Sequence, residues 1–188
     1  MNAAQSPARR RLLAGLLGAA CVPLFARATL AAAAATTAPA IRWLELTSTH
    51  TGESIKATYR DANGLVADAI ASLQHVLRDH RTGEAHAMDA GLYDQLADLA
   101  AAADAEPRYE IISGYRSPAT NAALRDKSTG VSSKSLHMEG RAMDVRLRGV
   151  SIERLNELAL ALARGGVGYY PGSRFVHIDT GRVRRWQG

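Results

Sequence analysis

The order of strand-type and helix-type segments constrains the fold of this chain more than any other feature. Six short runs have the alternation or apolar composition of strands, and four runs are typical of helices. Three of the four repeat apolar residues at helical spacing, and the run at 117–125 is indicated by its first two residues. The strand-type runs are residues 41–47, 54–59, 109–113, 142–147, 168–170 and 175–179. The helix-type runs are residues 65–78, 89–103, 117–125 and 151–163. This order predicts one α+β domain, an antiparallel sheet flanked by helices on one side.

Three of the helix-type runs begin with a residue that favours a helix N-cap. Asp89, Ser117 and Ser151 each have a short polar side chain that can accept a hydrogen bond from the first turn. Pro118 follows Ser117 at the first helical position, where a missing N–H costs nothing. The polar stretch 126–135 between the third helix and the next strand is expected to be a loop.

The first 35 residues have the organisation of an export signal rather than of a folded segment. Arg9, Arg10 and Arg11 precede an apolar run at residues 12–25, which is shorter than the ~20 residues that a membrane-spanning helix needs. The arginines predict a twin-arginine signal and a periplasmic or other extracytoplasmic location, with an ordinary secretory leader as the alternative. We therefore expect a signal peptide at residues 1–35 and one domain at residues 36–188.

The charge distribution argues against a nucleic-acid-binding function. The whole chain carries a net charge of +5, but residues 1–35 hold four arginines and no acidic residue. The remainder has 19 basic and 18 acidic residues, so it is close to neutral. A nucleic-acid partner is not expected for such a domain. Cys21 is the only cysteine, so an intramolecular disulfide is excluded.

Two histidines stand in contexts that differ from those of the other four. His137 precedes a strand-type run that contains Asp144, and Gly140 between them allows a tight reversal. The alternation of residues 175–179 turns His177 and Asp179 to the same face of a strand. Two imidazoles and one carboxylate are the ligands of an open zinc site with a fourth position for water. The spacing by itself leaves purely structural roles open for these residues.

Three segments, in order, resemble the D-Ala-D-Ala metallopeptidase and VanX group, whose members share the hedgehog-like zinc peptidase fold. They are SGYRS at residues 113–117, SLHMEGRAMD at residues 135–144 and FVHID at residues 175–179. The second segment matches the signature S-x-H-x-x-G-x-A-x-D of the group, and the third matches its last ligand strand. The mature chain as a whole is similar to the exported murein endopeptidases of this group.

The resemblance implies a role for each residue of these segments. It implies that His137, Asp144 and His177 bind one zinc ion. It also implies that Arg116 points into the cleft, where its guanidinium stabilises an oxyanion or binds a substrate carboxylate. Ser135 is implied as a substrate-contacting hydroxyl, with a local backbone cap as the alternative.

The general base is the point at which this chain departs from the group. Relatives carry Glu or His two or three residues before the last ligand, and these positions are Phe175 and Arg174 here. Asp179 is therefore predicted to take a proton from the zinc-bound water, and a role in holding an imidazole is the alternative. Glu139 is a third candidate.

The activity implied by the resemblance is that of a zinc metallopeptidase acting on peptidoglycan stem peptides, as a cross-link endopeptidase. A carboxypeptidase that releases D-alanine and a zinc-containing peptidoglycan-binding module without turnover are the alternatives. A monomer without a transmembrane segment is expected. A cluster of arginines near the C-terminus is expected to keep the tail solvated, although contact with the anionic wall is an alternative. These arginines are Arg182, Arg184 and Arg185.

Overall fold

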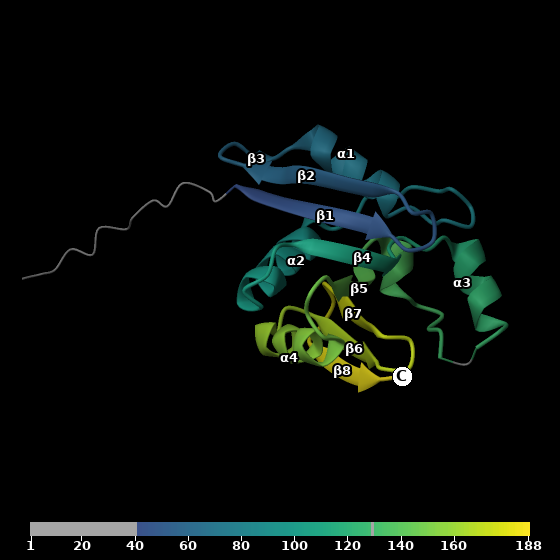
Figure 1. Ribbon diagram of the computed structural model, residues 1–188. Coiled ribbons are helices and arrows are strands. Elements are labelled where there is room, and N and C mark those ends of the chain that lie inside the picture. The colour runs from purple at the N-terminus through teal and green to yellow at the C-terminus, as the bar shows by residue number, and fades with distance from the viewer. Residues whose placement is uncertain (1–40, 129) are drawn as a thin grey trace, which may run out of the picture. The chain divides into compact units, whose positions relative to one another are not determined.

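The computed structural model describes residues 41–128 and 130–188 (Figure 1). The predicted export signal and Cys21 lie outside these residues, so the signal remains a prediction. The strands are β1 (Arg42–Ser48), β2 (Ser54–Asp61), β3 (Gly64–Leu65), β4 (Arg108–Ser113), β5 (Ala142–Leu147), β6 (Gly166–Tyr170), β7 (Phe175–Asp179) and β8 (Arg184–Gln187). The helices are α1 (Ala67–Val76), α2 (Ala90–Ala102), α3 (Pro118–Arg125), α4 (Ile152–Leu162) and the short 3-10 helix η1 (Leu136–Glu139).

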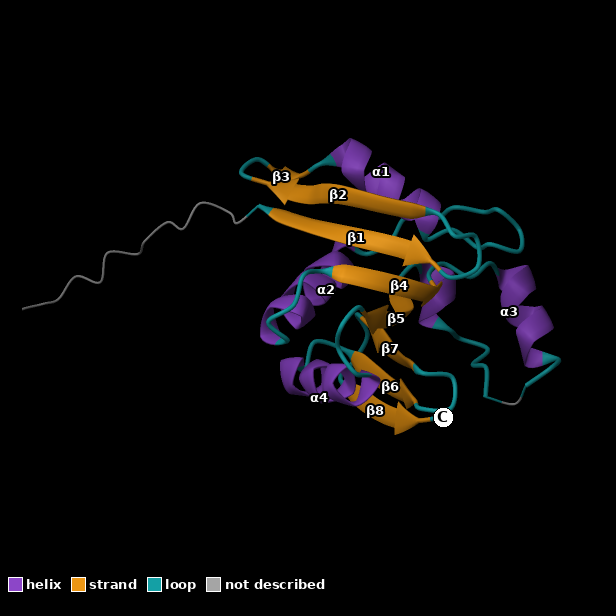
Figure 2. Cartoon of the chain, in the orientation of Figure 1, coloured by secondary structure: helices purple, strands orange, loops and turns teal. Residues whose placement is uncertain are grey.

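All the strands belong to one sheet, in the order β3-β2-β1-β4-β5-β7-β6-β8 (Figure 2). The α+β class is confirmed, and most neighbouring strands are antiparallel as expected. Two pairs are parallel, namely β1 with β4 and β6 with β8, so the sheet is mixed. β4 reaches β1 only after the chain has passed through β2, β3, α1 and α2, and no local pattern encodes such a pairing.

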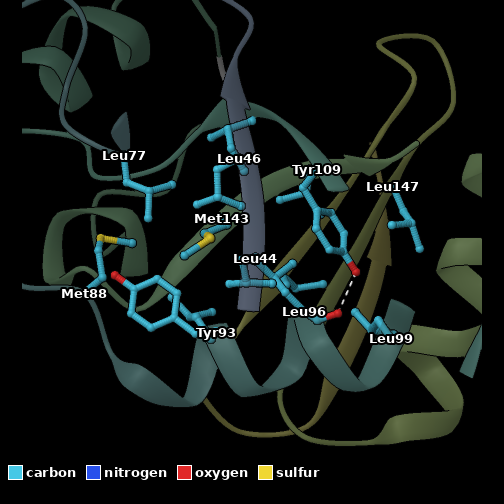
Figure 3. Close-up of a cluster of buried hydrophobic side chains, with 14 of the residues drawn as sticks. Leu44, Leu46, Leu77, Met88, Tyr93, Leu96, Leu99, Tyr109, Met143 and Leu147 are labelled. Carbon is cyan, nitrogen blue, oxygen red and sulfur yellow. Dashed lines mark hydrogen bonds between the residues drawn. The ribbon is translucent and has the colours of Figure 1, made fainter. Parts of the chain in front are cut away.

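One face of the sheet carries the hydrophobic core. Side chains of α1, α2 and α4 belong to the same buried cluster as the inward residues of the central strands. Figure 3 shows part of this cluster, in which Leu44 and Leu46 of β1 and Met143 of β5 lie over α2. The buried hydroxyl of Tyr109 donates to the carbonyl of Leu96 at 2.7 Å, which satisfies its polar atom within the core.

Three of the four predicted helix starts are confirmed. The side chains of Asp89, Ser117 and Ser151 each accept a hydrogen bond from a backbone N–H in the first turn of α2, α3 and α4. α1 begins later than predicted because Gly64 and Leu65 pair with β2 as β3. None of the helices in the described part of the chain is long and apolar enough to cross a membrane.

The C-terminal segment corrects one expectation. Residues 184–187 form β8 beside β6, and Arg184 makes an ion pair with Asp179 whose shorter distance is 2.6 Å. Arg184 is therefore not a solvated tail residue, whereas Arg182 and Arg185 are exposed. The pairing joins segments separated by β7, which the spacing of charges in the tail does not reveal.

Candidate metal centre and cleft

Asp144 and His177 come together because their strands pair. β5 and β7 are antiparallel, and Asp144 lies directly opposite His177 in the register. Both side chains are on the face away from the helices, since their neighbours Met143, Val145 and Val176 fill the core. The Asp144 Oδ1 and His177 Nδ1 atoms are 2.8 Å apart.

His137 reaches the same point from η1. Its Nδ1 is 2.8 Å from the carbonyl oxygen of Gly114, so a proton on Nδ1 leaves the Nε2 lone pair free. A Cβ at Gly114 would collide with the backbone of Leu77. Gly140 ends η1 with φ +65°, and a Cβ there would collide with the carbonyl oxygen of Ala87. Two glycines therefore allow the close packing that places His137.

The three donors have the separations that a tetrahedral metal requires. His137 Nε2 is 3.2 Å from His177 Nδ1 and 3.3 Å from Asp144 Oδ1, which completes a triangle with the 2.8 Å pair. Zinc bonded to nitrogen and oxygen at about 2.0–2.2 Å places tetrahedral ligands about 3.3 Å apart. All three residues are buried, and the group could hold one metal ion. The residues that are present therefore fit zinc.

The electrostatics of the group also favour a cation. Burial opposes the ionisation of Asp144, but both histidines outweigh it and hold the pKa of the carboxyl well below its usual range. Burial lowers the pKa of His137, which keeps this imidazole neutral. For His177 the effect of burial is outweighed by hydrogen bonds to Asp144 and Asp179, which raise its pKa. An ionised carboxylate beside a neutral imidazole is the protonation state in which such groups bind metal.

Asp179 lies behind His177, on the side away from the other two donors. Its Oδ2 is 3.2 Å from His177 Nε2, and the residue is fully buried. The carboxylate also accepts hydrogen bonds from the N–H groups of Gly166 and Gly181 and from two nitrogens of Arg184. Burial opposes its ionisation, yet these donors and His177 lower the pKa of Asp179 below its usual range. Its oxygens are thus occupied, and it does not line the cleft.

Arg116 lies beside the donor group with unused hydrogen-bonding capacity. Its side chain is 13% exposed, and its Nη2 atom is 3.8 Å from Asp144 Oδ2. The buried Nε–H has no hydrogen-bond partner within the described residues. Burial lowers the pKa of Arg116 without removing its charge at neutral pH. Because Arg116 lines the cleft, its terminal guanidinium nitrogens can donate hydrogen bonds to an anionic oxygen there.

Of the other residues considered from the sequence, some line the cleft and others lie outside it. Ser135 lines the cleft, and its side chain makes no capping hydrogen bond to η1, so the cap alternative is wrong. Glu139 is exposed and pairs with Arg141 at 3.2 Å, outside the cleft. His50 and His80 stack on one another with ring centroids 3.9 Å apart, and neither of them belongs to the donor group.

The donor group opens into a cleft of about 470 Å³. Its lining includes Ser128, residues between 130 and 136, and three aromatic side chains. Tyr170 and Phe175 stack with centroids 4.5 Å apart, and the indole N–H of Trp186 donates to the Tyr170 hydroxyl at 2.9 Å. A Cβ at Gly168 would lie 2.6 Å from the Trp186 ring, so only glycine leaves room for this indole.

No local sequence pattern marks the three aromatic residues or Arg184 as parts of the site. The sequence contains only ten Phe, Tyr and Trp residues, and three of them lie within residues 170–186. This concentration was the one available signal. It does not reveal that β8 crosses back to lie beside β6.

A mixed sheet with two imidazoles and a carboxylate at the wall of an open cleft has the donor set and accessibility of a metallohydrolase centre. The comparisons with known proteins agree with this class. The chain belongs to the family described as "Peptidoglycan L,D-endopeptidase MepK", whose pattern it matches over residues 36–186.

Curated relatives match over most of their length. The chain is 45% identical over 181 residues to the peptidoglycan L,D-endopeptidase MepK of Escherichia coli strain K12, covering 95% of this chain and 96% of that protein. It is 38% identical over 151 residues to the probable peptidoglycan L,D-endopeptidase MepK of Haemophilus influenzae, covering 80% and 81%. No solved structure gives a significant match.

Proposed function

We propose that this chain is a zinc-dependent peptidase that hydrolyses amide cross-links between peptidoglycan stem peptides. The observation that carries the proposal is the convergence of His137 Nε2, His177 Nδ1 and Asp144 Oδ1 at the wall of an open cleft. Relatives that align over nearly their whole length are named as peptidoglycan L,D-endopeptidases, which supports the substrate class.

A zinc ion held by these three residues would polarise the scissile carbonyl and lower the pKa of a bound water to about 7. The chain supplies the positioning of the donors. The Gly114 carbonyl accepts a hydrogen bond from the Nδ1–H of His137, and Asp179 Oδ2 accepts one from the Nε2–H of His177. Each imidazole is thereby fixed in the tautomer that presents its other nitrogen to the metal.

We assign Asp179 to this positioning role in preference to the general base that the sequence suggested. Its oxygens accept hydrogen bonds from two backbone N–H groups and from Arg184, and they face the far side of the His177 ring. A general base must come within hydrogen-bond reach of the proton that it removes, directly or through one water. The buried place of Asp179 behind His177 argues against such reach.

Arg116 is the residue that we expect to stabilise developing negative charge. Arg116 lines the cleft, and its Nη2 atom lies 3.8 Å from Asp144 Oδ2, so its guanidinium is beside the donor group. A donor preorganised in a partly buried site stabilises an oxyanion more strongly than water does. Ser135, whose side chain makes no capping bond, is proposed to contact the substrate beside it.

Export to the periplasm by the twin-arginine route remains part of the proposal, because it depends on residues 1–35. Replacing Arg9, Arg10 and Arg11 together with lysine should retain the precursor in the cytoplasm if the signal is of this type. An ordinary secretory leader would still be exported, since that route requires positive charge but not arginine.

Mass spectrometry of purified muropeptide dimers tests the activity directly. We expect the zinc-loaded mature protein to convert dimers to monomers and His137→Ala to leave them unchanged. Release of D-alanine from intact dimers would instead indicate a carboxypeptidase. Unchanged dimers with both proteins, together with retained binding to sacculi, would replace the proposal with a binding module.

A further inference from the structure

The charged side chains that line the cleft are mostly cationic. They are Arg116, Lys134, Arg184 and Asp144. Arg184 is paired with Asp179 at 2.6 Å, and Asp144 belongs to the metal-binding group. The positive charge that is left for a ligand therefore comes from Arg116 and Lys134. Within the described residues, no carboxylate lies within ion-pair distance of Lys134, and Arg116 approaches only Asp144.

Asn121 connects the segments that carry these two cations. This buried residue of α3 accepts a hydrogen bond from Arg116 Nη1 at 3.4 Å and donates to the carbonyl of Ser132 at 3.0 Å. The Ser132 hydroxyl in turn accepts from the backbone N–H of Lys134 at 3.1 Å. The chain of hydrogen bonds thus holds the backbone of Lys134 in a defined relation to Arg116. Lys134 itself is exposed and lines the cleft together with Ser132 and Ser135.

Charge of one sign within a concave site selects ligands of the opposite sign. Arg116 lies beside the donor group and is committed to the reacting oxygen in the proposed reaction. Lys134 has no such assignment, and its flexible ammonium can follow a carboxylate whose position varies among substrates. We propose that Lys134 recognises a free carboxylate of the peptide, next to the scissile amide, and so selects anionic cross-links. This inference rests on the proposed function for the identity of the peptide.

A pair of substrates that differ only in this charge tests the role of Lys134. One is a cross-linked peptide dimer with free carboxylates flanking the scissile bond, and the other is the same dimer with those carboxylates amidated. Both are given to the zinc-loaded wild-type protein, to Lys134→Gln and to Lys127→Gln. Lys127 is an exposed lysine next to the same loop that does not line the cleft, so it is the matched control.

The wild type should prefer the free acid by about ten-fold in kcat/KM, mainly through KM, as expected for one charged hydrogen bond. Lys134→Gln should lose this preference while keeping its zinc content, its melting temperature and its kcat on the amidated dimer. Lys127→Gln should keep the preference. An undiminished preference in Lys134→Gln, or an equal loss in both variants, would overturn the proposal.

Measurements of binding distinguish a failure of this inference from a failure of the proposed function. The dissociation constants of the free and amidated dimers are measured by calorimetry with the same three proteins. If the wild type cleaves neither dimer, the proposed function fails, and the binding data still decide the role of Lys134. A carboxylate preference that is lost only in Lys134→Gln supports the anion subsite, and a preference that all three proteins share contradicts it.

Discussion

The two histidines of the candidate metal centre are held in different ways. His177 lies within β7, where pairing with β5 sets its distance to Asp144 and the Arg184–Asp179 pair fixes its ring from behind. His137 lies on a short 3-10 turn, and a single backbone carbonyl fixes its ring. Half of the site is thus part of the sheet, and the other half depends on the packing of a connecting segment.

The two halves of the site should therefore respond differently to substitution. Strand pairing is supported by the ladder of hydrogen bonds and by the core beneath it. A substitution of one side chain there should therefore reduce activity while the protein stays folded. The segment that carries His137 is held by close backbone contacts at Gly114 and Gly140. A change in those contacts should destabilise the protein and displace a ligand at the same time.

The largest effect is expected when either half loses its metal-binding side chain. His137→Ala and His177→Ala should each reduce kcat/KM by about a thousand-fold or more, because zinc supplies several kcal/mol of transition-state stabilisation. Removal of the metal with a chelator should do the same and be reversed by added zinc. A variant that retained more than a tenth of the activity would show that its half does not bind the metal.

A substitution at Arg116 probes the half of the site that lies outside the sheet, and it leaves all three metal-binding side chains in place. Arg116→Lys keeps the charge but loses the planar set of donors, and we expect a fall in kcat of about 100-fold, as for loss of an oxyanion donor. Zinc content measured by mass spectrometry should be unchanged. A change in KM alone would instead indicate that Arg116 binds a substrate carboxylate.

A substitution at Asp179 probes the half of the site that belongs to the sheet. Asp179→Asn should weaken zinc affinity by about 10- to 100-fold, the usual effect of removing a partner that orients a metal-binding histidine. Titration against a competing chelator measures this, and excess zinc should restore much of the activity. Activity that stayed absent at saturating zinc would favour the general base that the sequence suggested. Arg185→Gln, at an exposed neighbour of Arg184, is the control that should have no effect.

Two glycine-to-alanine substitutions separate the cost of a positive φ from the cost of a steric clash with the backbone. Gly140→Ala should lower the free energy of unfolding by about 3 kcal/mol, since it combines positive φ with a clash against Ala87. Gly149→Ala also has positive φ but open space around it, and should cost only about 1–2 kcal/mol. Denaturant unfolding measures both variants. Equal losses would show that the packing of Gly140 contributes nothing to the placement of His137.

The smallest effect is expected at Asp79, whose carboxylate accepts hydrogen bonds from Ser117 and so holds the segment at residues 113–118. Burial opposes the ionisation of Asp79, but hydrogen bonds from Thr120, Arg81 and Ser117 outweigh it and hold its pKa below the usual range. A carboxyl with a lowered pKa stabilises the folded state above its unfolded pKa of about 3.9 and loses this effect as the pH falls towards the folded value.

Asp79→Asn should therefore lower the free energy of unfolding by about 2 kcal/mol at pH 7. The difference from the wild type should shrink as the pH falls below about 4. Urea unfolding at several pH values measures this dependence. A difference that stayed constant down to pH 2 would show that the Asp79 charge is not responsible.

Much of the fold and part of the site follow from local patterns. The alternation at residues 175–179 predicts β7 with the bounds that the structure has, and the helix caps at Asp89, Ser117 and Ser151 depend only on residues within one turn. His137, Asp144 and His177 were predicted as a group, and the structure brings their donor atoms together. Their roles as zinc ligands remain predictions for the experiments above.

What the sequence by itself determined is what short-range physics encodes: the period of each strand and helix, the capping residues, and the residue types that can bind a metal. Only the tertiary structure decided that β8 lies parallel to β6, that Arg184 neutralises Asp179, and that Trp186 fits over Gly168. The physical reason is that these contacts join segments through the whole sheet. Their partners are selected by the shared core and by the space left at Gly168, and neither leaves a periodic signal along the chain.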